Sequence, residues 1–475
     1  MAVLCLGSLI FMSRNTVAQA QSQVDTAVQR RIDARSFPGA AVAVVKNGRL
    51  ILAKGYGLAD VDAGTSVDEN TGFEIASLTK QFTAVGIMSL VEDRKLKLDD
   101  PLSKYLPDVP KSWNVITIRQ LLNQVSGIPD YAAPINEGGG TNVSPRKYSH
   151  REVLDLVRSR PLEFEPGTNW KYSNTNYFLL GMLIEKVSGR SYPGFMRDKV
   201  FKPLGMTSTR VNTSGLKLHG LATGYVLEKG FWRKAILDDP SQPFSAGAIV
   251  STADDMAKWS IAVASGKLLK KESWDAIWTP ARLADGRFTD YGFGWQLRNL
   301  GEAQYMGHAG GISGFSSYIA RFPQDDLTVV VLANHADTAT QALAFEIAGS
   351  YLPRVAAALA AEQARRNAVA IPDPDPKITI LIRSTFEKMI DGTVDRELFT
   401  TEMQKLLFPN ALIQMKTRLG NQGSIRSFEL LTADDTQGSK RRTYRVTFEA
   451  GMKLRINFTI DSEGKIAGVS MKPEQ

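Results

Sequence analysis

Residues Phe73–Gly86 read FEIASLTKQFTAVG and place Ser77 and Lys80 three positions apart, directly before an apolar segment. Apolar residues recur every three positions from Phe82 to Val91, which predicts a helix over residues 78–92 with one buried face. A lysine one helical turn after a serine can bring its amine to the hydroxyl and accept its proton if burial lowers the lysine pKa. The alternative is a serine that caps the helix, followed by a lysine that faces solvent.

The Ser-x-x-Lys spacing alone is weak evidence for a nucleophilic serine, because it also occurs at residues 144–147, 214–217 and 462–465. Each of these matches contains a glycine or a proline. Only Ser77 opens a long helix with an apolar face. Two further motifs follow in order: WKYSNTNYFLLG, which contains Tyr172-Ser-Asn174, and GHAGGISGFSSYIARF, which contains His308-Ala-Gly310. The three motifs together therefore indicate a serine-based active site.

Residues 37–351 resemble the serine β-lactamases and penicillin-binding D-Ala-D-Ala peptidases. The resemblance rests on the three motifs and on the segments PGAAVAVVKNG, LLNQVSGIPDY and FEPGTNWKYSN. Within that superfamily the chain resembles the class C-like branch, which includes family VIII esterases and D-amino acid peptidases. The resemblance implies Ser77 as the acyl-accepting nucleophile, Lys80 as its base or proton shuttle, and Tyr172 as a second general base or acid. Which of Lys80 and Tyr172 takes the first proton stays open.

The resemblance further implies that Asn174 binds a substrate amide and that His308-Ala309-Gly310 is the third motif. The oxyanion hole would be the backbone N–H groups of Ser77 and Gly311. Three structural alternatives remain: a core phenol for Tyr172, a helix cap for Asn174, and a histidine bonded to a neighbouring loop for His308. Many relatives carry Lys-Thr-Gly as the third motif. A neutral His308 would hold a substrate carboxylate less well, which favours esters or other less anionic acyl substrates.

PGAAVAVVKNGRLILAKGYG predicts two strands around the Lys46-Asn47-Gly48 turn, and YGFGWQL, GFSSYIARF and LTVVVLAN predict further strands. Helical patterns lie between them, among them residues 151–159. Strands at both ends of the region, with helices between them, predict an α/β sandwich. Its antiparallel sheet is flanked by helices and carries a helical subdomain. The segment RRNAVAIPDPDPK alternates proline and aspartate, which predicts an extended linker. After this linker, apolar and polar residues alternate over 443–448 and 454–460, which predicts strands of an antiparallel sheet with helices packed on one face. We therefore expect a serine hydrolase domain at residues 21–370 and a small C-terminal α+β domain at residues 371–475, for which the sequence indicates no function.

The N-terminus has a short apolar run ending in Ala18-Gln19-Ala20, so residues 1–20 are predicted to be a signal peptide of an exported, periplasmic or secreted bacterial protein. A disordered or partly helical tail is the alternative. No segment is long and apolar enough to span a membrane. Cys5 is the only cysteine, and the four histidines show no metal-ligand spacing, so no metal or other cofactor is predicted. The formal charge of +8 is scattered, which argues against nucleic-acid binding.

The sequence thus predicts a serine acyl hydrolase that acts through an acyl-enzyme on a small ester, amide or D-peptide, as an esterase, a D-peptidase or a weak β-lactamase. A Ser-His-Asp hydrolase is disfavoured because the chain lacks a Gly-x-Ser-x-Gly elbow. The remaining alternative is a slow penicillin- or peptide-binding sensor or scaffold that uses residues 371–475 to bind a protein partner or itself.

Overall fold

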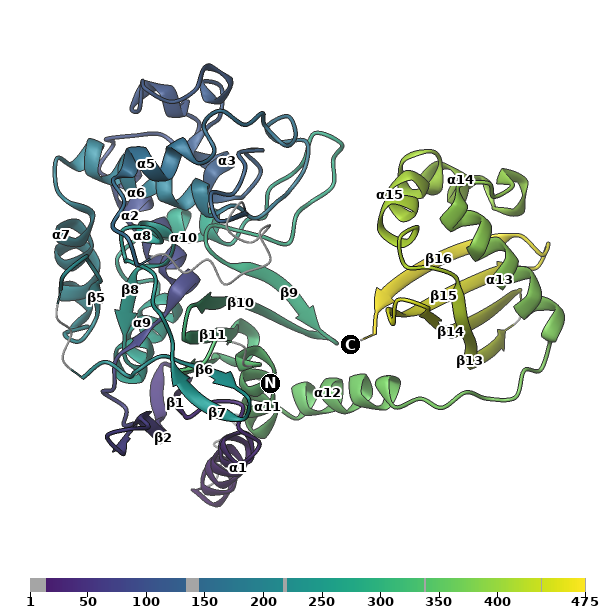
Figure 1. Ribbon diagram of the computed structural model, residues 1–475, viewed down its shortest axis with the longest axis horizontal. Coiled ribbons are helices and arrows are strands. Elements are labelled where there is room, and N and C mark those ends of the chain that lie inside the picture. The colour runs from purple at the N-terminus through teal and green to yellow at the C-terminus, as the bar shows by residue number, and fades with distance from the viewer. Residues whose placement is uncertain (1–13, 134–144, 217–219, 337–338, 437, 475) are drawn as a thin grey trace, which may run out of the picture. The chain divides into compact units, whose positions relative to one another are not determined.

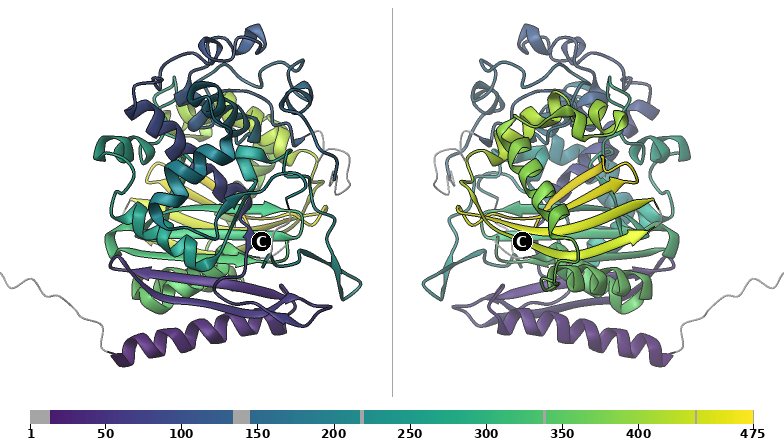
Figure 2. Two further views of the ribbon diagram at one scale, coloured as in Figure 1. Left: turned by 90° about the vertical axis from the view of Figure 1, so that its left-hand side faces the viewer. Right: turned by 90° about the vertical axis from the view of Figure 1, so that its right-hand side faces the viewer.

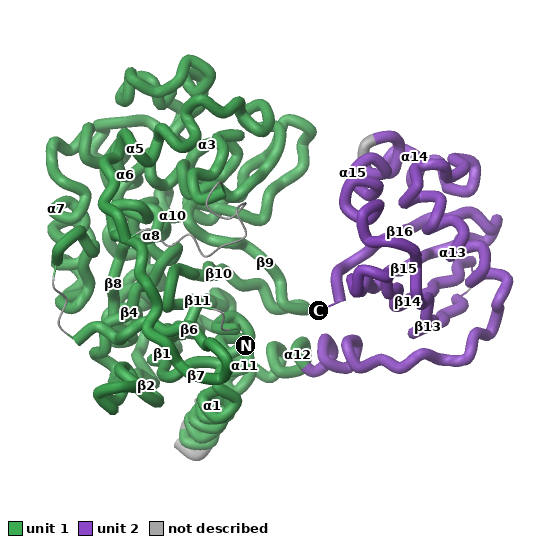
Figure 3. The backbone as a smooth tube through the Cα atoms, viewed as in Figure 1, with its two compact units in different colours: residues 1–359 green, residues 360–475 purple. Residues whose placement is uncertain are grey.

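The computed structural model (Figure 1) describes residues 14–133, 145–216, 220–336, 339–436 and 438–474. The chain divides into two compact units, Met1–Leu359 and Ala360–Gln475, which are coloured separately in Figure 3. Two hydrophobic clusters form the core of the first unit, and a third cluster forms the core of the second.

The first unit is built on a seven-stranded antiparallel sheet of order β3-β2-β1-β12-β11-β10-β9. The predicted hairpin forms its N-terminal part, with Asn47 and Gly48 at φ 50° and 67°, the left-handed conformation that a tight two-residue turn requires. Pairing of β1 with β12 joins the N-terminal and C-terminal strands of the unit. The strands are β1 (Gly39–Lys46), β2 (Arg49–Asp60), β3 (Thr65–Ser66), β9 (Gln296–Leu300), β10 (Ala303–Ile312), β11 (Phe315–Phe322) and β12 (Leu327–Ala333).

Both faces of this sheet are buried, because successive side chains of a strand point to opposite sides. On β1, Ala41, Ala43 and Val45 join the core shared with the helices at residues 79–92, 174–188 and 253–264. Ala40, Val42 and Val44 join the core shared with α1 (Arg14–Asp33) and with the helix at residues 340–351. Figure 2 shows α1 on one side of the sheet and the larger helical region on the other. The α/β sandwich predicted from the sequence is therefore confirmed.

The helices of the first unit are α1 (Arg14–Asp33), α2 (Thr79–Glu92), α3 (Ile118–Leu122), α5 (His150–Asp155), α6 (Asn174–Ser188), α7 (Tyr192–Met196), α8 (Phe244–Gly247), α9 (Ala253–Ala264), α10 (Lys271–Ile277), α11 (Thr340–Tyr351) and α12 (Pro353–Arg366), which continues into the second unit. Shorter turns are η1 (Ala76–Leu78), η2 (Leu102–Lys104), η3 (Lys111–Trp113), η4 (Arg197–Phe201), η5 (Lys202–Leu204) and η6 (Pro323–Asp325). Small sheets pair β4 (Phe73–Glu74) and β5 (Arg210–Val211) with β8 (Ile249–Ser251), and β6 (Tyr225–Glu228) with β7 (Phe231–Lys234).

Two elements have other bounds in the structure than the sequence predicts. The helix predicted for residues 151–159 is α5, which stops at Asp155; beyond it the chain makes single turns toward Pro161, whose ring disfavours helical geometry in the preceding residue. The strand predicted for YGFGWQL begins only at Gln296, because the Gly292 N–H bonds to the Trp295 carbonyl and Gly294 has φ 78°, which makes a turn.

The predicted signal peptide overlaps α1, which begins at Arg14, while residues 1–13 lie outside the described part. Ala20 is buried, and Ala18 and Gln19 before it are exposed. A cut after Ala20 would leave residues 21–33, which include the buried side chains of Val24 and Val28. No described helix is long and apolar enough to cross a membrane.

The second unit is a four-stranded antiparallel meander with helices on one face, which confirms the predicted α+β class of this region. The inward residues Tyr444, Val446 and Phe448 alternate with polar residues that point to the other face. The elements are α13 (Pro376–Asp391), η7 (Arg396–Leu398), α14 (Thr401–Leu407), α15 (Asn410–Leu419), β13 (Ile425–Thr436), β14 (Ser439–Phe448), β15 (Lys453–Asp461) and β16 (Ile466–Pro473).

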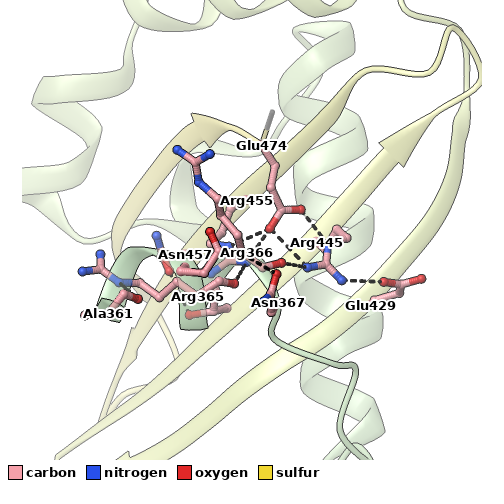
Figure 4. Close-up of polar contacts among 11 residues, drawn as sticks. Ala361, Arg365, Arg366, Asn367, Glu429, Arg445, Arg455, Asn457 and Glu474 are labelled. Atoms are coloured by element: carbon pink, nitrogen blue, oxygen red, sulfur yellow. Dashed lines mark hydrogen bonds and ion pairs between the residues drawn. The ribbon is translucent and has the colours of Figure 1, made fainter. Parts of the chain in front are cut away.

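This unit begins at Ala360, inside α12, and not at residue 371 after the proline-rich stretch. The carbonyls of Arg365 and Arg366 accept hydrogen bonds from Arg455 and Arg445 of the sheet. These bonds attach the end of α12 to the second unit ahead of the prolines. Figure 4 shows this group of contacts.

Candidate active site

Ser77 lies in η1, the turn between β4 and α2. The preceding Ala76 has φ 47°, a left-handed conformation that is unusual and strained for a residue with a side chain. Ile75 and Leu78 beside it are fully buried, so the turn is fixed in the core. Ser77 does not cap α2, whose N-cap residue is Leu78. Its hydroxyl instead meets Lys80 and Tyr172.

Lys80 points inward and is 0% exposed. Its Nζ lies 3.0 Å from Ser77 Oγ, 2.8 Å from Asn174 Oδ1 and 2.8 Å from the Ala246 carbonyl oxygen. Burial lowers the pKa of Lys80 to about 7, and the negative charge of Asp130 opposes this shift. The alternative of a solvent-facing lysine is therefore wrong, since the side chain is enclosed and bonded to three oxygens.

Tyr172 approaches the same hydroxyl from the segment before α6. Its O–H donates to Ser77 Oγ at 2.9 Å, and its ring lies 4.8 Å from Lys80 Nζ. Burial raises the pKa of Tyr172 above the usual value near 10, while the bond to Ser77 opposes this shift. At neutral pH the group is therefore a phenol that carries its proton.

Asn174 is the first residue of α6, whose N-cap residue is Ser173, and the Asn174 side chain is bonded to Lys80 and Asp130. Its Oδ1 accepts from Lys80, and its Nδ2 donates to Asp130 Oδ2 at 3.1 Å. Asp130 also accepts from the Asn174 backbone N–H through Oδ1, at 3.2 Å. Asp130 thereby orients the Asn174 amide so that its oxygen points toward Lys80.

Strand β10 brings Gly310 and Gly311 to η1. A Cβ at Gly310 would lie 2.2 Å from Ser317 Oγ and 2.4 Å from the Ile75 carbonyl oxygen, so only glycine fits there. A Cβ at Gly311 would meet nothing within 4 Å. β9 pairs with β10 only as far as Gly307, so the edge of β10 beyond it is not covered by β9.

His308 is 3% exposed and uses both ring nitrogens within the protein. Nδ1 lies 2.7 Å from the Ala309 carbonyl oxygen, so this nitrogen carries the proton; Nε2 then accepts from the Tyr291 hydroxyl at 2.9 Å. Burial, helped by the charge of Lys80, lowers the pKa of His308 to about 3. The ring is neutral, as expected, and packs beside Tyr172 with its centroid 6.0 Å away.

The structure thus brings Ser77, Lys80, Tyr172 and Asn174 into one bonded group, with Gly310 on the strand beside it and His308 behind Tyr172. Sequence reasoning did not single out three participants. Asp130 lies in the segment LLNQVSGIPDY, which already carried the family resemblance, and its acidic side chain was the available signal. Tyr291 lies in YGFGWQL, whose aromatic residues are typical of a core or cleft wall, and nothing in the sequence marks the carbonyl of Ala246.

A serine hydroxyl between a lysine of lowered pKa and a protonated phenol can lose a proton to one and receive one from the other. Within the described ranges, no group of three or more histidine, cysteine, aspartate or glutamate side chains is placed to hold a metal ion. The bonds among Ser77, Lys80 and Tyr172 support nucleophilic attack by the serine oxygen, with proton transfer to and from its two partners.

The sandwich and this serine, lysine and tyrosine group define the class of penicillin-binding and β-lactamase-type serine proteins. The chain belongs to the Beta-lactamase family, whose sequence profile matches residues 24–348. This confirms the superfamily predicted from the motifs, and it supports a serine hydrolase family in the broad sense.

Two curated relatives are similar to about two thirds of this chain. Penicillin-binding protein 4* of Bacillus subtilis (strain 168) is 32% identical over 314 residues, covering 63% of this chain and 68% of the relative. Protein flp of Staphylococcus aureus (strain MW2) is 32% identical over 333 residues, covering 66% of this chain and 63% of the relative. The chain thus spans about two thirds of the length of these relatives.

Two solved structures share the fold. D-amino acid amidase from Ochrobactrum anthropi SV3, complexed with D-phenylalanine, has a TM-score of 0.61 at 25% identity, covering 70% of this chain and 98% of that one. The octameric penicillin-binding protein homologue from Pyrococcus abyssi has a TM-score of 0.62 at 23% identity, covering 96% of this chain and 98% of that one. At that identity the second likeness shows the fold alone.

Proposed function

We propose that this chain is a serine acyl hydrolase that forms an acyl-enzyme on Ser77 and acts on small amides or esters. The observation that carries the proposal is the position of Ser77 Oγ, 3.0 Å from Lys80 Nζ and 2.9 Å from the Tyr172 hydroxyl. These distances put both groups within proton-transfer range of one hydroxyl.

Lys80 is the proposed base for the attack. The oxygens of Asn174 and Ala246 accept two of its N–H bonds, so the third tetrahedral position of the nitrogen faces Ser77. In the neutral amine that position is a lone pair, which can take the Ser77 proton. With a pKa of about 7, a substantial fraction of Lys80 is neutral at physiological pH.

Tyr172 is the proposed acid for the leaving group. Its raised pKa keeps the phenol protonated, and its O–H already points at Ser77 Oγ. After attack, the phenol donates its proton to the departing amine or alkoxide. Lys80 is protonated by then, and it can give a proton to the Tyr172 phenolate, which returns both groups to their starting states. A water molecule then releases the acyl group by the same steps in reverse.

The backbone N–H groups of Ser77 and Gly311 are the proposed oxyanion donors, supported by the open space at Gly311 and the edge of β10 that β9 leaves uncovered. His308 is proposed to support the site by position, because both of its nitrogens are engaged. A neutral third motif lacks a fixed cation for a substrate carboxylate. This favours acyl substrates without a carboxylate there, as expected from the sequence.

The test is hydrolysis of p-nitrophenyl acetate, D-phenylalanine amide and L-phenylalanine amide by the wild type and by Ser77→Ala. The amides are chosen because a similar structure is an amidase of D-amino acids. The matched control is Ser462→Ala, which removes the serine of another Ser-x-x-Lys match in an exposed turn. We expect Ser77→Ala to lower kcat/KM by about 10³-fold or more and Ser462→Ala to leave it unchanged.

Equal turnover by Ser77→Ala and the wild type would refute Ser77 as the nucleophile. A single burst of nitrophenolate without steady turnover would instead support the slow-binding alternative, in which the acyl-enzyme forms but is not hydrolysed.

We also propose that the protein is exported and that it self-associates. The predicted cut after Ala20 supports export. The second proposal extends the expectation from the sequence that residues 371–475 bind a protein partner or a second copy of the chain. N-terminal sequencing of protein from the periplasm or medium tests the first: a mature start at Gln21 supports it, and an intact Met1 in the cytoplasm contradicts it. Light scattering of the purified chain tests the second, and a monomer at all concentrations contradicts it.

A further inference from the structure

The sheet of the second unit has one face covered by α13, α14 and α15 and another face that carries polar side chains. Tyr444 and Ile456 point into the helix-covered core, so the residues that alternate with them point the other way. The strand register aligns two rows across β14, β15 and β16, one basic and one of hydroxyl and amide groups. We call this surface the open face; it comprises Thr443, Arg445, Arg455, Asn457, Ser470 and Lys472.

The end of α12 is fixed over the open face by contacts inside this unit (Figure 4). Arg445 Nη2 donates to the Arg366 carbonyl at 2.9 Å, and Arg455 Nη2 donates to the Arg365 carbonyl. These guanidinium groups satisfy carbonyls in the last turn and offset the negative end of the helix dipole. The helix end therefore adds little negative potential to the space beside it.

A cavity of about 510 Å³ lies between this helix end and the open face. Its apolar wall contains Ala364, Ala368 and Leu431. Leu431 is the extra residue of a bulge in β13, is 4% exposed, and lies outside the core cluster that contains its neighbour Leu430. A buried leucine on an otherwise polar face gives the cavity a small apolar floor, and Thr443 and Asn457 add polar groups to the wall.

The charges around this cavity are positive. Arg365, Arg455 and Lys472 line it, and none of its lining residues is acidic. The nearby Glu474, whose side chain is 9% exposed, is paired with both Arg445 and Arg455, so its charge is compensated. Within the described ranges, Arg365 and Lys472 form no ion pair with an acidic side chain, and both are exposed. The cavity therefore has an excess of positive charge.

We propose that this cavity binds a small organic anion, with its carboxylate or phosphate group held by Lys472 and Arg365 and a short apolar chain on Leu431 and the two alanines. Arg455, already held by Glu474, presents a fixed guanidinium to the same group. The linked side chains of Thr443 and Asn457, whose Oγ1 and Oδ1 lie 2.8 Å apart, supply neutral donors and acceptors. The site lies wholly within the second unit, to which the sequence assigned no function.

The test is isothermal titration of the full-length chain with four probes of one chain length: hexanoate, hexyl phosphate, 1-hexanol and hexylamine. The double variant Lys472→Gln/Arg365→Gln removes the two unpaired charges, and neither change breaks an ion pair. The matched control is Lys388→Gln/Arg418→Gln, which removes an exposed lysine and arginine from α13 and α15 on the other face of the sheet.

We expect one or both anions to bind, the alcohol and the amine to bind more weakly, and the double variant to bind the anion about tenfold more weakly than the wild type. The control variant should bind as the wild type does. The relative affinities of hexanoate and hexyl phosphate identify which acid the site prefers. Anion binding that is unchanged in the double variant, or no anion binding up to the solubility limit, overturns the proposal.

Discussion

Replacing Tyr172 by phenylalanine should separate its role as an acid from its role in packing. The change removes only the hydroxyl that donates to Ser77 Oγ at 2.9 Å, and it leaves the ring beside His308 and Lys80. General acid catalysis contributes about 10²- to 10⁴-fold, so we expect kcat/KM for an amide to fall by that factor, or about 3–5 kcal/mol in activation free energy. Loss of the hydrogen bond should destabilise the fold by only about 1 kcal/mol.

The assay compares an amide with p-nitrophenyl acetate. Nitrophenolate leaves without a proton, so the ester should lose less than about tenfold while the amide loses the full factor. Tyr351→Phe is the control, because its hydroxyl is buried in the core on the other side of the sheet and has no hydrogen-bond partner among the described residues. Equal losses on the amide and the ester would refute the acid role and indicate that Tyr172 is needed for the attack itself.

Two further predictions concern the base and the strand beside it. Because the neutral form of Lys80 is the base and its pKa is about 7, kcat/KM should rise with pH through about 7 and then level off; a profile that is flat or falls through this region would contradict the assignment. Gly310→Ala should lower activity by about 10²-fold or more, since its Cβ would lie 2.4 Å from the Ile75 carbonyl oxygen and would push β10 away from η1. Gly468→Ala in β16, whose Cβ would lie no closer than 3.4 Å to Thr459, should retain most activity; similar activity in the two variants would argue against a tight fit at Gly310.

The sequence predicted the architecture where the local pattern and the tertiary environment agree. The strands β14 and β15 could be predicted because their apolar and polar residues alternate along the sequence. The first hairpin could be predicted because Asn47-Gly48 is a local turn signal between two strand patterns. YGFGWQL was misassigned because its aromatic residues have strand propensity, whereas its glycines make a turn. The start of the second unit was placed too late because arginines about 80 to 90 residues away bind the end of α12.

The order of the three motifs predicted which residues meet at the site, but not how they are bonded. Asn174 could have been a cap, and only the fold shows its amide held between Lys80 and Asp130. The lowered pKa of Lys80 depends on burial by side chains distant in sequence, which spacing does not reveal. For the same reason, the engagement of both His308 nitrogens could not be predicted.

The central claim is an acyl-enzyme on Ser77, and intact-mass spectrometry tests it most directly. The protein is mixed with p-nitrophenyl trimethylacetate, whose bulky acyl group is released slowly, then quenched in acid and digested to map the adduct. We predict a mass increase of one trimethylacetyl group on the peptide that contains Ser77, absent from Ser77→Ala and present in Ser462→Ala. An adduct on another residue, or the same adduct in Ser77→Ala, would contradict the account.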